Sequence, residues 1–187
     1  YRGAFTFPRE FQLSDTANGL RLVQRPADEL HRLRGSAQQW ENVSITEQPW
    51  RTALPDVAVE LVASWEIPRD TAAERLSLTL QWGDAAQVVI AYEIQVGRLT
   101  VDRTRAGIVD FHPDFAVIHR APLIVEKEIL SLRFLLDRQM LELFANEGHI
   151  TFTEQLFPPE VPLTLSIQAE GAPLKMRHLE IYPLRLL

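Results

Sequence analysis

The sequence contains no cysteine, and its 187 residues include only 8 glycines. Without cysteine the chain has no disulfide, no thiol nucleophile and no cysteine-type zinc site. The glycines form neither a phosphate-binding loop nor a G-x-S-x-G nucleophile elbow. No apolar run approaches the length of a transmembrane helix, so no membrane partner is expected. These absences exclude several enzyme classes, and we expect neither a cofactor nor a bound metal.

Positive charge is also in short supply. Acidic residues number 25 against 19 basic ones, which gives a net charge of −6 at pH 7. Proteins that bind nucleic acid present a basic face, so we expect no nucleic-acid partner. Hydrophobic residues make up 46% of the chain, which indicates a globular protein. The length suits one or at most two domains.

The clearest pattern lies between Leu130 and Pro158, where apolar and polar residues alternate in three consecutive runs. Leucine or phenylalanine occupies every second position from 130 to 136. The second run places Leu141 and Leu143 on one face, with Glu142 between them on the other. Short segments containing Asp, Asn and Gly separate the runs and are typical of turns. The segment therefore predicts a three-stranded antiparallel meander.

Similar alternation occurs through most of the chain. It predicts further strands at 56–67, 75–82, 88–94, 99–102, 162–169 and 174–182. Near the start, short strands at 4–7 and 11–13 lead into a hairpin whose loop is longer than two residues. Residues 26–33 begin with Pro, carry acids before bases, and predict a helical turn. Residues 103–125 predict a long loop. The fold class is therefore all-β: a two-sheet antiparallel β-sandwich of the lectin-like, jelly-roll type, preceded by a connector with one helical turn.

Few titratable residues form a catalytic pattern. Asp137 and Glu142 are a candidate glycosidase pair, because such enzymes place two carboxylates across the scissile bond. A turn role for Asp137 and a packing role for Glu142 explain the same residues more simply. His112 and His119 flank Asp114, where a metal site is the alternative to a solvated loop.

Aromatic side chains stack on sugar rings, so exposed ones are candidate carbohydrate-binding residues. Trp65 and Trp82 are in phase with aliphatic positions, and we predict that they lie in the core. The candidates for carbohydrate binding are Trp40, Trp50, Phe111 and Phe115. For the two tryptophans, a contact between domains is an equally good interpretation.

Four segments, in this order, resemble the C-terminal part of glycoside hydrolase family 32, which comprises invertases, levanases, inulinases and sucrose-6-phosphate hydrolases. Arg2–Glu10 reads RGAFTFPRE and is similar to the R-G-A-M-T-x-P-R-E segment that closes the family's catalytic domain. Residues 20–30 resemble the connector that follows. Thr100–Thr104 is similar to an x-x-D-R-T strand, and 132–158 resembles the D-R-x-x-x-E-x-F-x-N…F-P signature.

The resemblance implies a parent enzyme with a five-bladed β-propeller that carries the active site and a β-sandwich appended behind it. The family's catalytic motifs, N-D-P-x-G, R-D-P and E-C, are absent from this sequence, so it has no catalytic residue to assign. We expect residues 1–35 to be the end of the propeller segment and the connector, and residues 36–187 to be the sandwich.

By this resemblance, the chain is a non-catalytic domain that stabilises the propeller of a β-fructosidase acting on sucrose, levan or inulin. The alternative is a fructan-binding accessory module. The expected partner is the propeller of the same parent chain, with a fructan oligosaccharide or a second copy as further alternatives. We expect secretion, with a cytoplasmic location as the alternative.

Overall fold

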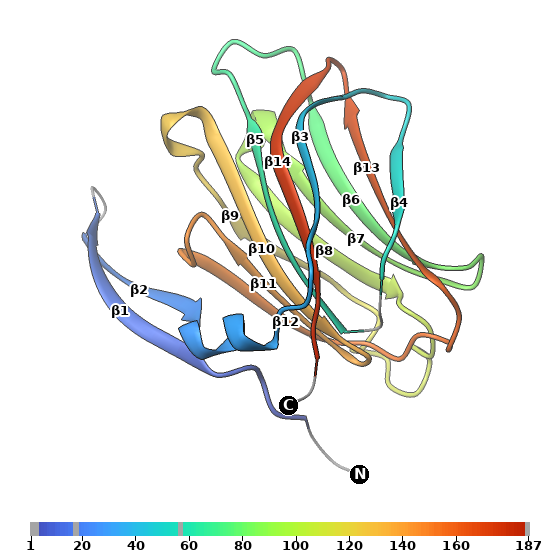
Figure 1. Cartoon of the computed structure of the whole chain (residues 1–187). Helices are drawn as coiled ribbons and strands as arrows, with labels where there is room; N and C mark the ends of the chain where they lie inside the picture. Colours follow the sequence, from blue (N-terminus) through green and yellow to red (C-terminus); the bar gives the residue numbers. More distant parts are fainter. Residues whose placement is uncertain (1–3, 17–18, 56–57, 186–187) are drawn as a thin grey trace.

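Two six-stranded antiparallel sheets pack face to face in the computed structural model, which describes residues 4–16, 19–55 and 58–185 (Figure 1). The strand order is β12-β11-β10-β5-β14-β3 in the first sheet and β4-β13-β6-β7-β8-β9 in the second. A two-stranded hairpin, β1-β2, precedes the sandwich. The prediction of an all-β, two-sheet antiparallel β-sandwich is confirmed.

The first sheet consists of β3 (Gln38–Ile45), β5 (Ala58–Glu66), β10 (Ile129–Asp137), β11 (Met140–Ala145), β12 (Ile150–Gln155) and β14 (Leu174–Pro183). The second consists of β4 (Trp50–Ala53), β6 (Arg75–Trp82), β7 (Ala86–Glu93), β8 (Arg98–Arg105), β9 (Ile118–Pro122) and β13 (Leu163–Glu170). The hairpin strands are β1 (Arg9–Thr16) and β2 (Gly19–Pro26).

Short 3₁₀ helices are the only helical elements in the described part of the chain: η1 (Asp28–Leu33), η2 (Ile94–Val96) and η3 (Glu126–Glu128). The first confirms the helical turn predicted at 26–33. No helix of the described residues is long and apolar enough to span a membrane.

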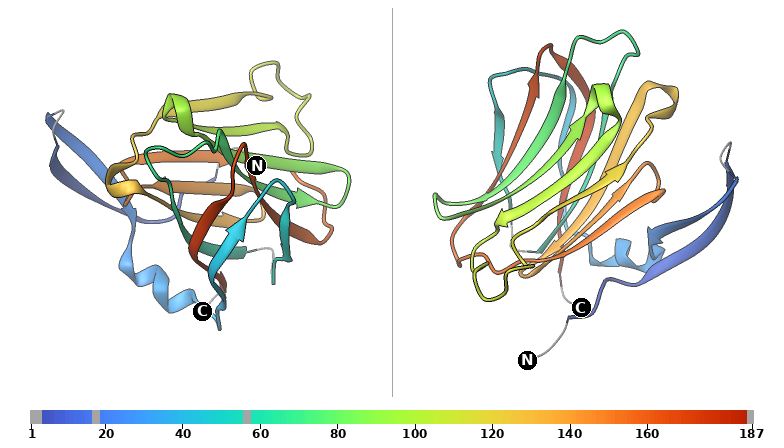
Figure 2. Two further views of the ribbon diagram at one scale, coloured as in Figure 1. Left: turned by 90° about the horizontal axis from the view of Figure 1, so that it is seen from above. Right: turned by 180° about the vertical axis from the view of Figure 1, so that it is seen from behind.

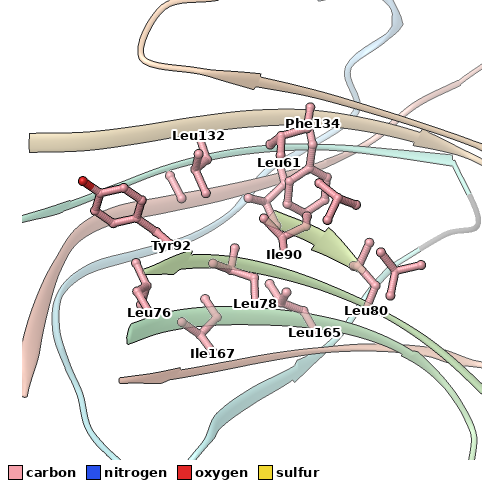
Figure 3. Close-up of a cluster of buried hydrophobic side chains, with 14 of the residues drawn as sticks. Leu61, Leu76, Leu78, Leu80, Ile90, Tyr92, Leu132, Phe134, Leu165 and Ile167 are labelled. Atoms are coloured by element: carbon pink, nitrogen blue, oxygen red, sulfur yellow. The ribbon is translucent and has the colours of Figure 1, made fainter. Parts of the chain in front are cut away.

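The hydrophobic core lies between the two sheets, where the inward faces of alternating strands meet (Figure 3). Leu78 of β6 faces Leu61 of β5 and Phe134 of β10, and all three are at most 1% exposed. Trp65 and Trp82 are also buried, which confirms the prediction that they belong to the core. Period-two alternation therefore identified the inward face correctly.

The expected meander is formed by β10, β11 and β12. Asp137 pairs with Met140, which leaves a two-residue turn between β10 and β11. The turn between β11 and β12 contains three consecutive residues with positive φ, namely Asn146, Glu147 and Gly148. Asn and Gly adopt this conformation more readily than other residues, so the turn lies where the sequence predicted it.

The N-terminal hairpin differs from the prediction in two respects. The predicted strand at 4–7 is wrong: Pro8 has no backbone N–H to donate to a ladder, and the N–H of Phe7 donates to the carboxylate of Glu142 instead. Thr16 pairs with Gly19, so only residues 17 and 18, which lie outside the described residues, separate the strands. The predicted loop of more than two residues is therefore wrong. Residues 56 and 57, the first two of the predicted strand 56–67, also lie outside the described residues.

The predicted loop at 103–125 is wrong in two parts. Strand β8 continues to Arg105, and Ile118–Pro122 forms the edge strand β9. An edge strand pairs on one side only, and the residues of β9 are exposed or half-buried. Its sequence therefore lacks the alternation that marks a strand with one buried face.

Candidate functional site

A second, smaller apolar cluster lies on the outer face of the first sheet, the face turned away from the core. It consists of Leu30, Leu135, Phe144 and Leu184, with Phe7, Leu33 and Ala58 packed against it. Leu30 and Leu33 belong to η1, so the connector covers this part of the sheet. The outer face is therefore partly an interface rather than a solvated surface.

Two fully buried glutamates lie in this interface. Leu135 pairs with Glu60 on one side and with Glu142 on the other, so the three side chains share the outer face across β5, β10 and β11. Both carboxylates are 0% exposed. A buried carboxylate needs hydrogen-bonding or ionic partners, and in this protein the N-terminal segment supplies most of them.

Glu142 binds Phe7 and Arg9, at the point where the chain enters the hairpin. Its Oε2 lies 2.9 Å from Nη2 of Arg9, and its Oε1 accepts a hydrogen bond of 2.9 Å from the backbone N–H of Phe7. The same guanidinium donates to Gln24 of β2 and to Thr153 of β12. Arg9 therefore joins both hairpin strands to the sandwich through one planar group, whose five donors suit such a junction.

Glu60 accepts hydrogen bonds from two arginines. Nε and Nη2 of Arg34 lie 2.6 Å and 2.7 Å from its two carboxylate oxygens, and Nε of Arg133 lies 2.5 Å from Oε1. Arg34 follows η1, and its guanidinium also lies 4.2 Å from the ring centre of Tyr182. Glu60 therefore fixes the end of the connector against β10 and β14, whereas Glu142 fixes the start of the hairpin.

The neighbouring arginines determine the ionisation state of Glu60. Burial alone would raise the pKa of Glu60, but the hydrogen bonds and charges of Arg34 and Arg133 outweigh it and lower the pKa below its usual value. The hydrogen bond to Glu60 raises the pKa of Arg34, against the effect of burial. The ionised form of the cluster is therefore the stable one at neutral pH.

A close backbone contact adds a third attachment of the hairpin. The N–H of Gln24 donates to the carbonyl of Gly148, in the turn between β11 and β12, at 3.1 Å. Gly148 has φ +86°, and a Cβ at this position would lie 1.9 Å from the carbonyl oxygen of Gln24. Only glycine fits this approach without displacing one of the two chains.

Beyond these attachments the hairpin extends away from the sandwich (Figures 1 and 2). Its cross-strand register places four apolar residues on one face, with Leu13 opposite Leu22 and the others two residues away. Phe11, Leu13, Leu20 and Leu22 are 64%, 67%, 66% and 50% exposed. A two-stranded hairpin with a wholly exposed apolar face indicates an interaction surface.

The predicted carbohydrate-binding residues fall into two separate pairs. Trp40 and Trp50 lie on β3 and β4, the edge strands at one side of the two sheets, with ring centres 5.2 Å apart in an edge-to-face arrangement. They pair with Leu179 and Ile167, which belong to the core, so they share its face of each sheet. The tryptophans therefore close this side of the sandwich.

Phe111 and Phe115 lie between β8 and β9, with ring centres 4.5 Å apart, and both contact Phe157. Phe115 also stacks on the guanidinium of Arg103. Phe111 remains 56% exposed, whereas the other three candidates are half-buried, so its ring is the most exposed of the four. Sequence reasoning placed it in a loop, and that position is confirmed.

The other catalytic and metal candidates do not converge. Asp137 is exposed at a turn, whereas Glu142 is buried against the connector. His119 contacts Glu154 at 2.7 Å, away from His112, which lies 3.9 Å from Asp114. Across the part of the chain that the structure describes, no three His, Cys, Asp or Glu side chains gather as a metal-ligand set.

Sequence reasoning did not identify the two glutamate clusters. Alternation in the sequence places Glu60 and Glu142 on the faces opposite the apolar stripes, as they lie in the structure, but it does not indicate that a second layer covers them. One signal was present: Phe144 shares this polar face, and Val62 interrupts it in β5. An apolar residue on the polar face of a strand indicates that the face has a partner.

Residues 29–183 match the family model described as "Glycosyl hydrolases family 32 C terminal". The chain belongs to this family. As a family 32 C-terminal domain, it is 29% identical over 192 residues to a levanase of Bacillus sp. (strain L7), a match that covers 99% of the chain and 20% of that levanase. A levanase of Bacillus subtilis (strain 168) is also 29% identical, over 99% of the chain and 28% of the levanase.

The fold of this family 32 domain also matches a solved structure. The exo-inulinase of Aspergillus awamori superposes with a TM-score of 0.83 at 20% identity, over 96% of the chain and 35% of the exo-inulinase. The family 32 chain thus spans about a fifth to a third of the length of these relatives. The hairpin lies before residue 29, where the family match begins, although the longer relatives align with nearly the whole chain.

Proposed function

We propose that this chain is the non-catalytic sandwich of a β-fructosidase and that it stabilises a catalytic β-propeller preceding it in the parent protein. The hairpin carries this proposal. Contacts of Arg9 and Gly148 attach it to the sandwich, yet it presents Leu13 and Leu22 to solvent. Residues 1–35 are then the end of the propeller segment and the connector, and residues 36–187 the sandwich.

Two further observations support this role. The relatives are three to five times longer than the matched segment, so each has room for a separate catalytic domain. They are levanases and exo-inulinases, which favours levan or inulin as the substrate class of the parent, and the family resemblance adds sucrose. One relative is an extracellular exo-inulinase of Aspergillus awamori, 21% identical over 97% of the chain, which favours secretion.

The docking role is tested in the full-length parent by making the hairpin face acidic. Leu13→Asp with Leu22→Asp should lower the melting temperature and fructosidase activity of the parent, because both side chains would be charged in an apolar interface. The matched control is Val96→Asp with Ile124→Asp, which changes two similarly exposed residues on the sandwich itself. Equal effects of the two double variants would contradict docking through the hairpin.

The absence of catalysis in this chain is tested separately. The purified 187-residue chain should release no fructose from sucrose, levan or inulin, since the acid pair Asp137 and Glu142 is divided between a turn and a buried ion pair. Release of fructose that Glu142→Gln abolishes would overturn the assignment. A parent that keeps full activity and thermal stability after deletion of residues 36–187 would overturn the stabilising role.

A fructan-binding accessory role is the second candidate function. It is favoured by the half-exposed ring of Phe111, which lies against Phe115, and Phe115 in turn stacks on the guanidinium of Arg103. Sugar rings stack on such surfaces while guanidinium groups bond their hydroxyls. In calorimetric titrations with levan and inulin oligosaccharides, Phe111→Ala should then weaken binding, whereas Trp50→Leu, which alters the opposite side of the sandwich, should not.

A further inference from the structure

Two grooves on the outer face of the first sheet meet at one residue, His178. One, of about 400 Å³, runs over β3 and β14, and the other, of about 280 Å³, runs over β5, β10 and the end of β11 beneath the connector. Together they cross five adjacent strands. Since neighbouring strands lie about 4.8 Å apart, the combined trough is roughly 19 Å long.

A local irregularity shapes the centre of this trough. The register of β14 against β5 shifts between Met176 and His178, which makes Arg177 the extra residue of a β-bulge. Across from it, Asn42 has φ +54°. Bulges redirect side chains, and both Arg177 and Asn42 project as exposed residues at the groove.

His178 is held in a fixed orientation at the junction. Its Nδ1 lies 3.0 Å from Oγ of the buried Ser64, while the described part of the chain supplies no hydrogen bond to its Nε2. The carboxylate of Glu147 and the hydroxyl of Ser131 line the second groove and likewise have no side-chain hydrogen bond within the described residues. The trough therefore offers both free donors and free acceptors.

The charges of the trough balance. Its arginines are Arg25, Arg34, Arg133 and Arg177, and its acidic residues are Glu41, Glu147 and Glu180, together with Glu60 beneath. The four arginines and four glutamates give the trough a net charge of zero, so it favours neither an anionic nor a cationic ligand. A hydroxyl group both donates and accepts, and a polyhydroxylated neutral chain matches such a mixed lining best.

We propose that this trough binds a neutral oligosaccharide chain lying across the strands, from β3 toward the connector. The length suits several linked sugar units, and the lining has few apolar side chains to hold a protein helix. Phe144 and Val62 supply the apolar floor in the second groove. This inference rests on the accessory binding role proposed above, assigns it a site distinct from Phe111, and is independent of docking by the hairpin.

The test uses the 187-residue chain, with levan-type and inulin-type oligosaccharides as probes and calorimetry and ¹⁵N chemical shifts as readouts. Arg177→Ala and His178→Ala should each weaken binding about fivefold or more, the effect of losing one hydrogen bond. Arg177 is exposed in the bulge, so its variant keeps the fold, as its unfolding midpoint will show. Arg69→Ala is the matched control: the Arg69 side chain is 86% exposed and does not line the trough, so the affinity should stay unchanged.

Three outcomes would overturn the proposal. One is the absence of binding to both neutral oligosaccharides. Another is binding that Phe111→Ala removes while Arg177→Ala and His178→Ala preserve it. The third is tighter binding of an anionic oligogalacturonate than of the neutral chains, which would make the trough an anion site. Leu13→Asp with Leu22→Asp should not alter oligosaccharide binding, so failure of docking and failure of this proposal are distinguishable.

Discussion

The guanidinium of Arg9 and the carboxylate of Glu142 lie 2.9 Å apart, although 133 residues separate them in the chain. Arg9 belongs to the R-G-A-x-T-x-P-R-E-like segment and Glu142 to the D-R-x-x-x-E-like signature. Two motifs that looked independent are therefore the two halves of one buried ion pair. The pair connects the hairpin, the proposed docking element, to the sandwich.

Replacing Glu142 by Gln should destabilise the chain. The change keeps the side-chain volume but leaves the largely buried guanidinium of Arg9 without a counter-charge, which should cost about 2 to 3 kcal/mol. Urea unfolding measures the loss. The control is Glu66→Gln, which breaks a half-exposed pair with Lys175 and should cost less than about 1 kcal/mol. Similar losses in both variants would mean that the buried pair contributes no more than a surface one.

The Glu60 cluster should make stability depend on acid pH. The pKa of Glu60 is lower in the folded chain than in the unfolded chain, where it is near 4.5. The ionised carboxylate therefore stabilises the folded chain fully above pH 4.5, and this contribution disappears as the pH falls through the lower folded pKa. The free energy of unfolding of the wild type should accordingly exceed that of Glu60→Gln at pH 7, and the difference should shrink in acid.

The measurement is urea unfolding of both chains between pH 7 and pH 2.5 at constant ionic strength. Glu66→Gln serves as the matched control, because Glu66 is 39% exposed and pairs with Lys175 at the surface. A gap between wild type and Glu60→Gln that stays constant across this range would show that the arginines do not depress the pKa of Glu60.

The two glutamates also mark the limit of prediction from the sequence. Alternation correctly placed Glu60 and Glu142 opposite the core-facing residues, because a strand in a sandwich turns every second side chain inward. Their burial comes from Arg9, Arg34 and the connector, which reach them across 26 to 133 residues of sequence. The alternation pattern of a strand is the same whether its glutamate faces water or a distant arginine, so the sequence pattern does not distinguish the two cases.

The positions of Trp40 and Trp50 were also not predictable from their local sequence. Trp40 and Trp50 lie in strands whose other residues are largely exposed, so their sequence neighbours did not predict an inward face. Each is directed inward by its pairing with a core residue of a distant strand. The edge strand β9 was missed for a related reason, since its pairing with β8 leaves no apolar alternation.

Gly148→Ala should loosen the hairpin more than Gly19→Ala does. Both glycines have a positive φ, +86° and +88°, so both variants carry the strain of a left-handed alanine, about 1 to 2 kcal/mol. At Gly19 nothing lies within 4 Å of the added Cβ, whereas at Gly148 the Cβ would lie 1.9 Å from the carbonyl oxygen of Gln24. Only the second variant must also separate two backbones.

Limited proteolysis within the hairpin, together with urea unfolding, measures this difference. Gly148→Ala should be cleaved faster in residues 9–26 and should lose at least about twice the free energy that Gly19→Ala loses. Cleavage at equal rates would show that the contact between Gly148 and Gln24 does not hold the hairpin in place.

The pairing of Trp40 with Trp50 should be measurable as a coupling energy. Each Trp→Leu variant removes one ring of an edge-to-face contact that joins the edges of both sheets, so the two losses should not add. A double-mutant cycle in urea should give a coupling of about 0.5 to 1.5 kcal/mol. A coupling of zero, with Trp50→Leu weakening oligosaccharide binding, would return Trp50 to the carbohydrate-binding role that its sequence first suggested. A clear coupling with unchanged binding would establish that the ring closes the sandwich.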